Sequence, residues 1–166
     1  MTMRWDRFYD MAQADIQRVF DAVDDAVRED RRPRIVGNER QRPLRQKRKN
    51  RLDQVLVRCL VATHFRVDLL QKMRIKDMCF DSPEGPYLML RWKNGQTDAL
   101  KVEIDHELAR LLMEWVSEYR RTARLNECVF TPGARRGRNL PENYISTVFQ
   151  HWCREVGISL RELSGW

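Results

Sequence analysis

The chain has 166 residues, of which 42% are hydrophobic and 33% charged, so it is long enough to bury the core of one domain. Its mean hydropathy is −0.66, and no apolar run reaches the roughly eighteen residues of a membrane helix. The mixed acidic, aromatic and basic stretch from Met1 to Asp10 lacks the apolar core of a secretory signal. These features exclude a membrane-spanning or secreted protein, and we expect a cytoplasmic one.

The cysteines and histidines show no metal-ligand spacing. Cys59, Cys79, Cys128 and Cys153 form no C-x-x-C pair and no Cys-His motif. We therefore expect reduced, mostly buried thiols, and neither a metal nor another cofactor.

The chain opens with an amphipathic pattern. Apolar residues recur at steps of three and four from Trp5 to Val27, which predicts a helix with one apolar face. We assign residues 1–30 to this N-terminal helix.

A strongly basic segment follows. Arg31 to Arg51 contains ten Lys or Arg residues against one acid, a net charge of +9, so the net +7 of the whole chain leaves −2 for the rest. Pro33, Gly37 and Pro43 interrupt any hydrophobic period, which predicts an exposed loop or arm over residues 31–50. Such concentrated charge favours phosphate binding by counterion release, and a solvated, disordered charge run is the alternative.

Helical periodicity returns at Arg51 and continues through Met73 as a pair of helices, which begins a body assigned to residues 51–166. Alternating patterns over 87–92 and 99–104, around an Asn-Gly dipeptide, predict a β-hairpin. The fold class is therefore mainly α with a small antiparallel β-sheet (α+β).

The remaining elements follow from local signals. Asp105 is a plausible N-cap for a long amphipathic helix, and Cys128-Val-Phe130 is a short strand candidate that precedes a second basic loop. Pro141 can open the last helix and Gly157 can end it.

Three stretches carry a resemblance to a known family. The first, His64-Phe65-Arg66 with the apolar positions through Met78, follows the pattern Gly-Leu-Arg plus helix. The second, Lys93-Asn94-Gly95, occupies a hairpin turn. The third, Val129-Phe130, leads through a basic loop to a helix that ends near Ile158. In this order they resemble the catalytic domain of tyrosine recombinases (phage integrases) over roughly residues 51–158. The resemblance implies a truncated catalytic-domain-like fold.

The resemblance also implies residue roles. In such recombinases a tyrosine attacks the scissile phosphate, two arginines and a histidine hold its oxygens, and a lysine protonates the leaving oxygen. Arg66 matches the first arginine and Lys93 the lysine, whereas Arg161 is a candidate for the second arginine. The second catalytic box and the nucleophilic tyrosine should lie after Ile158, where eight residues remain.

The chain departs from the family in the first box, which has His64-Phe65 for Gly-Leu and Leu69 for a glutamate. Arg66 can also be read as a helix-surface charge or as an ion pair with Asp68 or Asp77, and Lys93 as a solvated turn residue. The four tyrosines, all upstream of the family's nucleophile, are expected to pack: they are Tyr9, Tyr87, Tyr119 and Tyr144. We expect no strand exchange by this chain alone.

The leading hypothesis is a DNA-binding protein of integrase-like fold without recombinase activity, a regulator or accessory factor of a mobile element that associates with the nucleoid. Its predicted partner is double-stranded DNA, bound through Arg42, Arg45, Lys47, Arg48, Lys49, Arg51, Arg66, Lys93, Arg135, Arg136 and Arg138.

Two alternatives stay open. One is a fragment of an active recombinase that needs a missing C-terminal part. The other is a protein-interaction role, in which the chain pairs with itself or with a full-length recombinase through apolar surface contributed by Phe149, Trp152 and Trp166.

Overall fold

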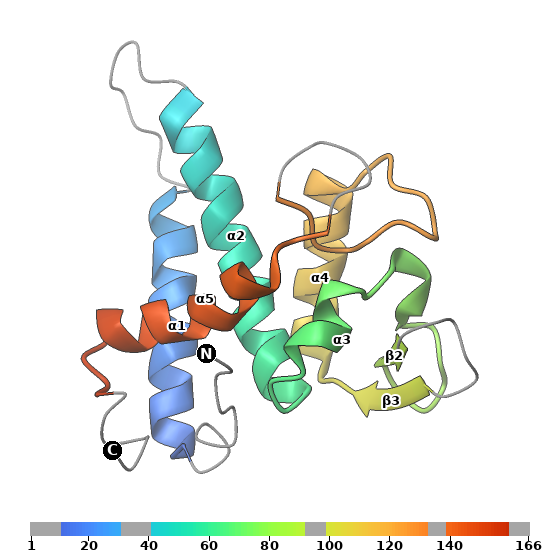
Figure 1. Ribbon diagram of the computed structural model, residues 1–166, viewed down its shortest axis with the longest axis horizontal. Helices are drawn as coiled ribbons and strands as arrows, with labels where there is room; N and C mark the ends of the chain where they lie inside the picture. The colour runs from blue at the N-terminus through green and yellow to red at the C-terminus, as the bar shows by residue number, and fades with distance from the viewer. Residues whose placement is uncertain (1–10, 31–40, 92–98, 133–138, 160–166) are drawn as a thin grey trace.

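The computed structural model describes residues 11–30, 41–91, 99–132 and 139–159, with the backbone alone at 41–45 (Figure 1). Its elements are α1 (Gln13–Asp30), α2 (Gln41–Ala62), α3 (Val67–Gln71), the short 3-10 helix η2 (Ile75–Asp77), β1 (Met78–Cys79), β2 (Tyr87–Arg91), β3 (Ala99–Glu103), α4 (His106–Tyr119) and α5 (Glu142–Glu155). The predicted class, mainly α with a small antiparallel sheet, is confirmed.

The N-terminal helix packs against α2. Val19, Val23 and Val27 bury the apolar face that the periodicity predicted. Polar contacts join the same two helices, because the Asp24 carboxylate accepts hydrogen bonds from Gln54 Nε2 at 2.8 Å and from both terminal nitrogens of Arg58 at 3.0 and 2.8 Å.

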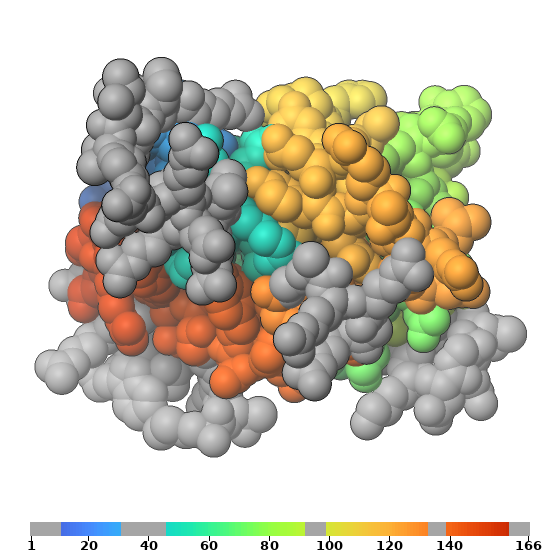
Figure 2. Space-filling view, turned by 90° about the horizontal axis from the view of Figure 1, so that it is seen from above, coloured from blue at the N-terminus to red at the C-terminus, as the bar shows by residue number. Residues whose placement is uncertain are grey.

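Helix α2 is the centre of the molecule. It contacts α1, α4 and α5, and between Leu52 and Leu60 every residue except Arg58 is buried. In the space-filling view, α2 is seen between α4 and α5 (Figure 2). A helix enclosed on several sides needs apolar residues around its circumference rather than on one face.

The predicted loop over 31–50 is wrong for its second part, because α2 begins at Gln41. Pro43 does not prevent this, since it lies in the first turn of the helix, where a backbone N–H has no partner to lose. Residues 31–40 lie outside the described residues.

The sheet has the strand order β1-β2-β3, with both pairs antiparallel. Leu88 pairs with Met78 and Val102, and Arg91 pairs with Ala99, which confirms the two predicted hairpin strands. The turn between them falls outside the described residues. Strand β1 was not predicted, because two residues are too few to show alternation.

Helix α4 begins as predicted. Asp105 Oδ1 accepts a hydrogen bond from Leu108 N at 2.7 Å, which is an N-cap. The predicted strand Cys128-Val-Phe130 is wrong, since it forms a single bridge between Cys128 and Arg74. Val129 and Phe130 are nevertheless buried, and the Val129 carbonyl accepts a hydrogen bond from Trp115 Nε1 at 2.9 Å.

Helix α5 crosses α1 and α2 (Figure 1) and also contacts α3. It begins after Pro141 and ends at Glu155, and Gly157, just beyond, has a φ of +75° that suits a left-handed helix cap. Phe149 and Trp152 were expected to contribute exposed apolar surface, and this is wrong: they are 0% and 7% exposed. Trp166 lies outside the described part of the chain.

All four cysteines are free thiols, with Cys59 and Cys153 buried and Cys79 and Cys128 half-buried. Among the helices that the structure describes, none combines the length and the apolar character needed to cross a bilayer.

Candidate nucleic-acid interface

Four of the predicted DNA contacts lie close together on the N-terminal half of α2. Lys47, Arg48, Lys49 and Arg51 are consecutive or nearly so, and a helix turns successive residues to different sides. The cations therefore do not form a single row, and their partners differ.

Arg48 points into the protein. Its Nη2 donates to the Thr131 carbonyl at 2.9 Å and its Nη1 to the Pro132 carbonyl at 3.4 Å. The guanidinium also lies 5.0 Å from the Trp115 ring centre and 5.8 Å from that of Tyr119, within cation–π range. Burial lowers the pKa of Arg48 from its usual value. These contacts anchor α2 to the segment after α4.

Lys49 pairs with a buried carboxylate. Its Nζ lies 3.3 Å from Asp53 Oδ2, and the Asp53 side chain is 1% exposed. The same carboxylate accepts hydrogen bonds from Tyr144 OH at 2.6 Å and from Trp152 Nε1 at 3.0 Å. The network joins α2 to α5 and satisfies a charge that would be costly to bury alone.

Arg51 pairs with the outer face of α4, at 3.3 Å from Glu114 and 3.1 Å from Glu118. Lys47 differs from its neighbours: it is half-buried and shows no hydrogen bond or ion pair to the other described side chains. Within this part of α2, Lys47 thus differs from Arg48, Lys49 and Arg51, whose described partners are given above.

Arg66 follows a turn with an unusual backbone. His64 and Phe65 have φ values of +53° and +59°, in the left-handed region that favours glycine. The amide of Phe65 donates to the Leu60 carbonyl at 2.7 Å and that of His64 to the Val61 carbonyl at 3.3 Å. This is the Schellman pattern of a helix end, so the backbone adopts a glycine-type cap without a glycine.

The backbone at Arg66 is itself a tight turn, because Val67 N donates to the Phe65 carbonyl at 3.0 Å. Arg66 is therefore the residue that precedes α3, and not a residue within a helix. Phe65 packs edge-on against Phe149 at 5.1 Å and holds the turn on the core. The Arg66 side chain is exposed.

The structure does not support the two ion pairs considered for Arg66. Asp77 is buried and accepts instead from Arg91 Nε at 3.0 Å and from Arg74 N at 3.0 Å. Among the described residues, no ion pair links Arg66 to Asp68.

Seven predicted site residues have no described side chain. Arg42 and Arg45 belong to α2, whose first residues are described by their backbone. The others lie outside the described residues: Lys93, Arg135, Arg136, Arg138 and Arg161.

The tyrosines of the helices have packing roles. Burial and the neighbouring Asp53 carboxylate raise the pKa of Tyr144, so its phenol stays protonated and donates to that carboxylate. The ring of Tyr119 lies 4.8 Å from that of Trp115, and burial raises the pKa of Tyr119 as well. Both pKa values are raised rather than lowered, so both phenols are protonated near neutral pH.

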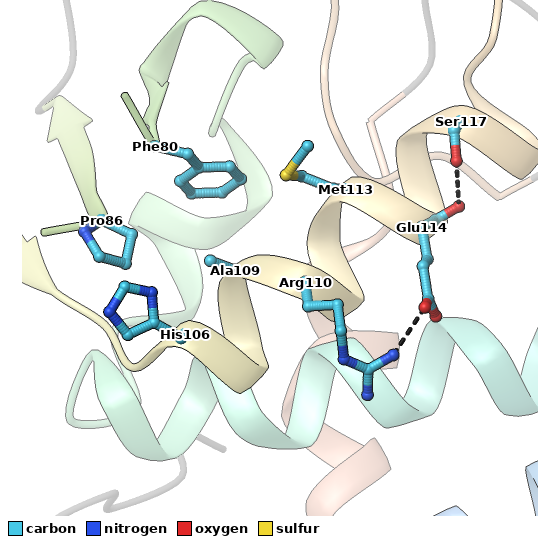
Figure 3. A pocket seen from close by; sticks show the side chains of 8 residues that line it. All are labelled: Phe80, Pro86, His106, Ala109, Arg110, Met113, Glu114 and Ser117. Atoms are coloured by element: carbon cyan, nitrogen blue, oxygen red, sulfur yellow. Dashed lines mark hydrogen bonds and ion pairs between the residues drawn. The ribbon is translucent and has the colours of Figure 1, made fainter. Parts of the chain in front are cut away.

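A groove of about 470 Å³ lies between α4 and the sheet (Figure 3). Its apolar lining comes from Phe80, Pro86 and Met113. Arg110 lies on the rim, where its guanidinium is 2.6 Å from Glu114 and hydrogen-bonds to Glu107, which lowers the pKa of Glu107. None of the predicted site residues with a described side chain lines this groove.

No protein-family model matches the sequence, and no curated protein matches it either. Among solved structures, the chain is similar to the XerH site-specific recombinase bound to its difH substrate in a pre-cleavage complex. The identity is 14% and the TM-score is 0.63, with 90% of this chain and 37% of the recombinase chain covered. The chain therefore has a recombinase-like fold, consistent with the expected tyrosine-recombinase catalytic-domain-like fold, and it spans well under half of its neighbour's length.

Proposed function

We propose that the chain is a DNA-binding protein on a recombinase fold, without recombinase activity of its own, and that it acts as a regulator or accessory factor of a mobile element. The observation that carries the proposal is a fold shared over 90% of the chain with a recombinase bound to DNA. The net +9 of residues 31–51, part of which begins α2, supplies the charge that phosphate binding requires.

The predicted DNA-binding cations fall into two groups, those that contact phosphates and those that hold α2 in place. Lys47 and the exposed Arg66 are the described cations that we assign to phosphates. We assign the same role to Arg42, Arg45, Lys93, Arg135, Arg136 and Arg138. Arg48 and Arg51 support the interface from within, because their internal partners hold α2 in place.

Fluorescence anisotropy of a labelled random-sequence duplex, titrated across a salt series, tests the proposal. If each of these eight cations neutralises one phosphate, the slope of log affinity against log salt should be about −7. Absence of binding at about 50 mM salt would leave the fold without this function.

The second candidate function is a fragment of an active recombinase, and the position of Arg66 after the α2 turn favours it. An assay for a covalent intermediate distinguishes the two candidates. Duplexes that bind the protein are first selected from a random pool, and each is then nicked so that a covalent intermediate is trapped. We expect no covalent protein–DNA band on a denaturing gel, since the described helix tyrosines are hydrogen-bonded or packed. Such a band would overturn the non-catalytic proposal.

A further inference from the structure

A second set of cations lies away from α2, on the chain between α3 and the sheet. Residues 72–76 read Lys-Met-Arg-Ile-Lys, and burial alternates along them. Met73 is buried and Ile75 half-buried, whereas Arg74 and Lys76 are exposed and Lys72 is half-exposed. The apolar members hold the segment on the core while the cations face outward.

Hydrogen bonds fix this segment against residues 125–129. Ile75 N donates to the Glu127 carbonyl at 3.0 Å and Lys76 N to the Leu125 carbonyl at 2.9 Å. The Arg74 guanidinium donates to the Asn126 carbonyl at 3.0 Å. Arg124, exposed and next to Leu125, thus lies beside Lys76.

The nearest acids do not cancel these cations. Asp77 is buried and already pairs with Arg91 at 3.0 Å. Glu127 pairs at 3.2 Å with Arg120, whose side chain is 5% exposed. Asp68, one turn before Lys72, is the nearby exposed acid. Outside residues 31–51 the chain has a net charge of −2, so this positive surface does not reflect a generally basic body.

Contacts of Arg48 link the basic half of α2 to the segment that carries Arg124. Arg48 of α2 contacts Tyr119, the last residue of α4, and the Thr131 carbonyl. Arg124 and residues 125–129 belong to the segment between these two contacts. In Figure 1 the start of α2 and the end of α4 both point toward the top of the view, and the segment that follows α4 lies on its right.

We propose that Lys72, Arg74, Lys76 and Arg124, named here the second basic surface, bind the phosphate backbone of duplex DNA and extend the contact made by α2. The inference rests on the proposed function. A surface of exposed ammonium and guanidinium groups suits a regular polyanion. An acidic peptide would also need a pocket for its side chains, and none of these four residues lines the groove beside α4.

The test compares two triple variants that remove the same charge. Lys72→Gln, Lys76→Gln and Arg124→Gln change cations without a described ion pair, so the backbone contacts of Arg74 remain. The control changes Lys101, Arg110 and Arg154 to Gln, which are exposed cations on β3, α4 and α5. Anisotropy with the random-sequence duplex is measured for both variants and the unchanged protein over one salt series.

If the second basic surface binds phosphates, the magnitude of the salt slope should fall by about 2.7 in the first variant, or about 0.9 for each phosphate contact. In the control variant the magnitude of the salt slope should fall by less than about 1. The single variants Lys76→Gln and Arg124→Gln should each lose about 0.9, so the result does not depend on the triple variant. Unfolding in urea confirms that each variant is folded.

If the unchanged protein does not bind DNA, the proposed function fails. If it binds, but both triple variants have the same slope, the proposed function survives and the second basic surface is overturned. A titration with polyglutamate tests whether the surface binds an acidic protein instead of DNA. A variant that loses polyglutamate binding and keeps its DNA slope would assign the surface to an acidic protein and also overturn the inference.

Discussion

At the scale of single residues, His64 adopts a backbone conformation that glycine usually provides. Its φ is +53°, in the left-handed region. For residues with a Cβ this conformation is unfavourable. The Schellman hydrogen bonds and the contact of Phe65 with Phe149 offset that cost.

Replacement of His64 should therefore stabilise the protein when the new residue tolerates a positive φ. We expect His64→Gly to raise the free energy of unfolding by about 0.5–1 kcal/mol, as measured by urea denaturation. His64→Asn should give a smaller gain, since asparagine enters this region more readily than most residues. His64→Ala is the control, and a gain equal to that of glycine would show that backbone strain is not the cause.

At the scale of elements, α2 combines two kinds of surface along one helix. Its second half is enclosed by α1, α4 and α5, and its first half carries the cations. Arg48, Lys49 and Arg51 each reach partners on another element or on a buried carboxylate. The basic charge of this half therefore stabilises the fold as well as supplying a candidate DNA contact.

Variants of Arg48 and of its neighbour Lys47 distinguish stabilisation of the fold from DNA contact. Arg48→Met should lower the free energy of unfolding by about 1–3 kcal/mol, because the Thr131 carbonyl loses a charged donor and the Trp115 and Tyr119 rings lose a cation. Lys47→Met should change it by less than about 0.5 kcal/mol. Urea denaturation of both variants measures the difference.

Loss of the charge at Lys47 should affect DNA binding rather than stability. Lys47→Met should reduce the magnitude of the salt slope by about 0.9, with stability unchanged. Arg48→Lys, which keeps the charge, should still destabilise the protein, since lysine cannot reproduce two parallel donations and ring stacking. Equal stability of the Arg48→Lys and unchanged proteins would contradict a structural role for the guanidinium.

At the scale of the whole molecule, one core encloses two thiols. Burial raises the pKa of Cys59 and of Cys153 to about 12 each. An unfolded cysteine has a pKa of about 8.5. The folded state therefore holds these protons more tightly than the unfolded state, and the stability that this difference provides is complete below about pH 8.5 and is lost as pH rises toward 12.

The free energy of unfolding should thus fall between pH 8 and pH 9.5, by about 1 kcal/mol per thiol and pH unit above 8.5. Urea denaturation at several pH values measures the slope. Cys59→Ala should lower stability at pH 7 through the lost contacts, and it should also flatten the pH dependence. An unchanged slope in this variant would show that the Cys59 thiol does not cause it.

Elements with a clear period or cap could be predicted from the sequence. The hairpin strands, α4 with its Asp105 cap and α5 with Gly157 all depend on residues within a few positions of one another. Strand β1 was too short for such a signal. The first turns of α2 were misread because Pro43 and the run of charge hide the helical pattern. Arg48 and Arg51, in the turns that follow, contact other elements.

The candidate site could be predicted only in outline. The sequence located the basic segment and Arg66, since charge density and motif order are local properties. It did not indicate the second basic surface, because Lys76 and Arg124 are distant in the chain and meet only when residues 72–76 pair with 125–129. The alternation of cations along residues 72–76 was the signal that could have suggested an exposed row.

The sequence by itself determined the fold class and the concentration of positive charge, since both follow from the order of residues along the chain. Only the tertiary structure decided which cations are available to a ligand. Arg48 and Arg51 are held by internal partners and Arg66 is exposed. The physical reason is that the availability of a charge depends on neighbours in space, and folding brings those neighbours from remote parts of the chain.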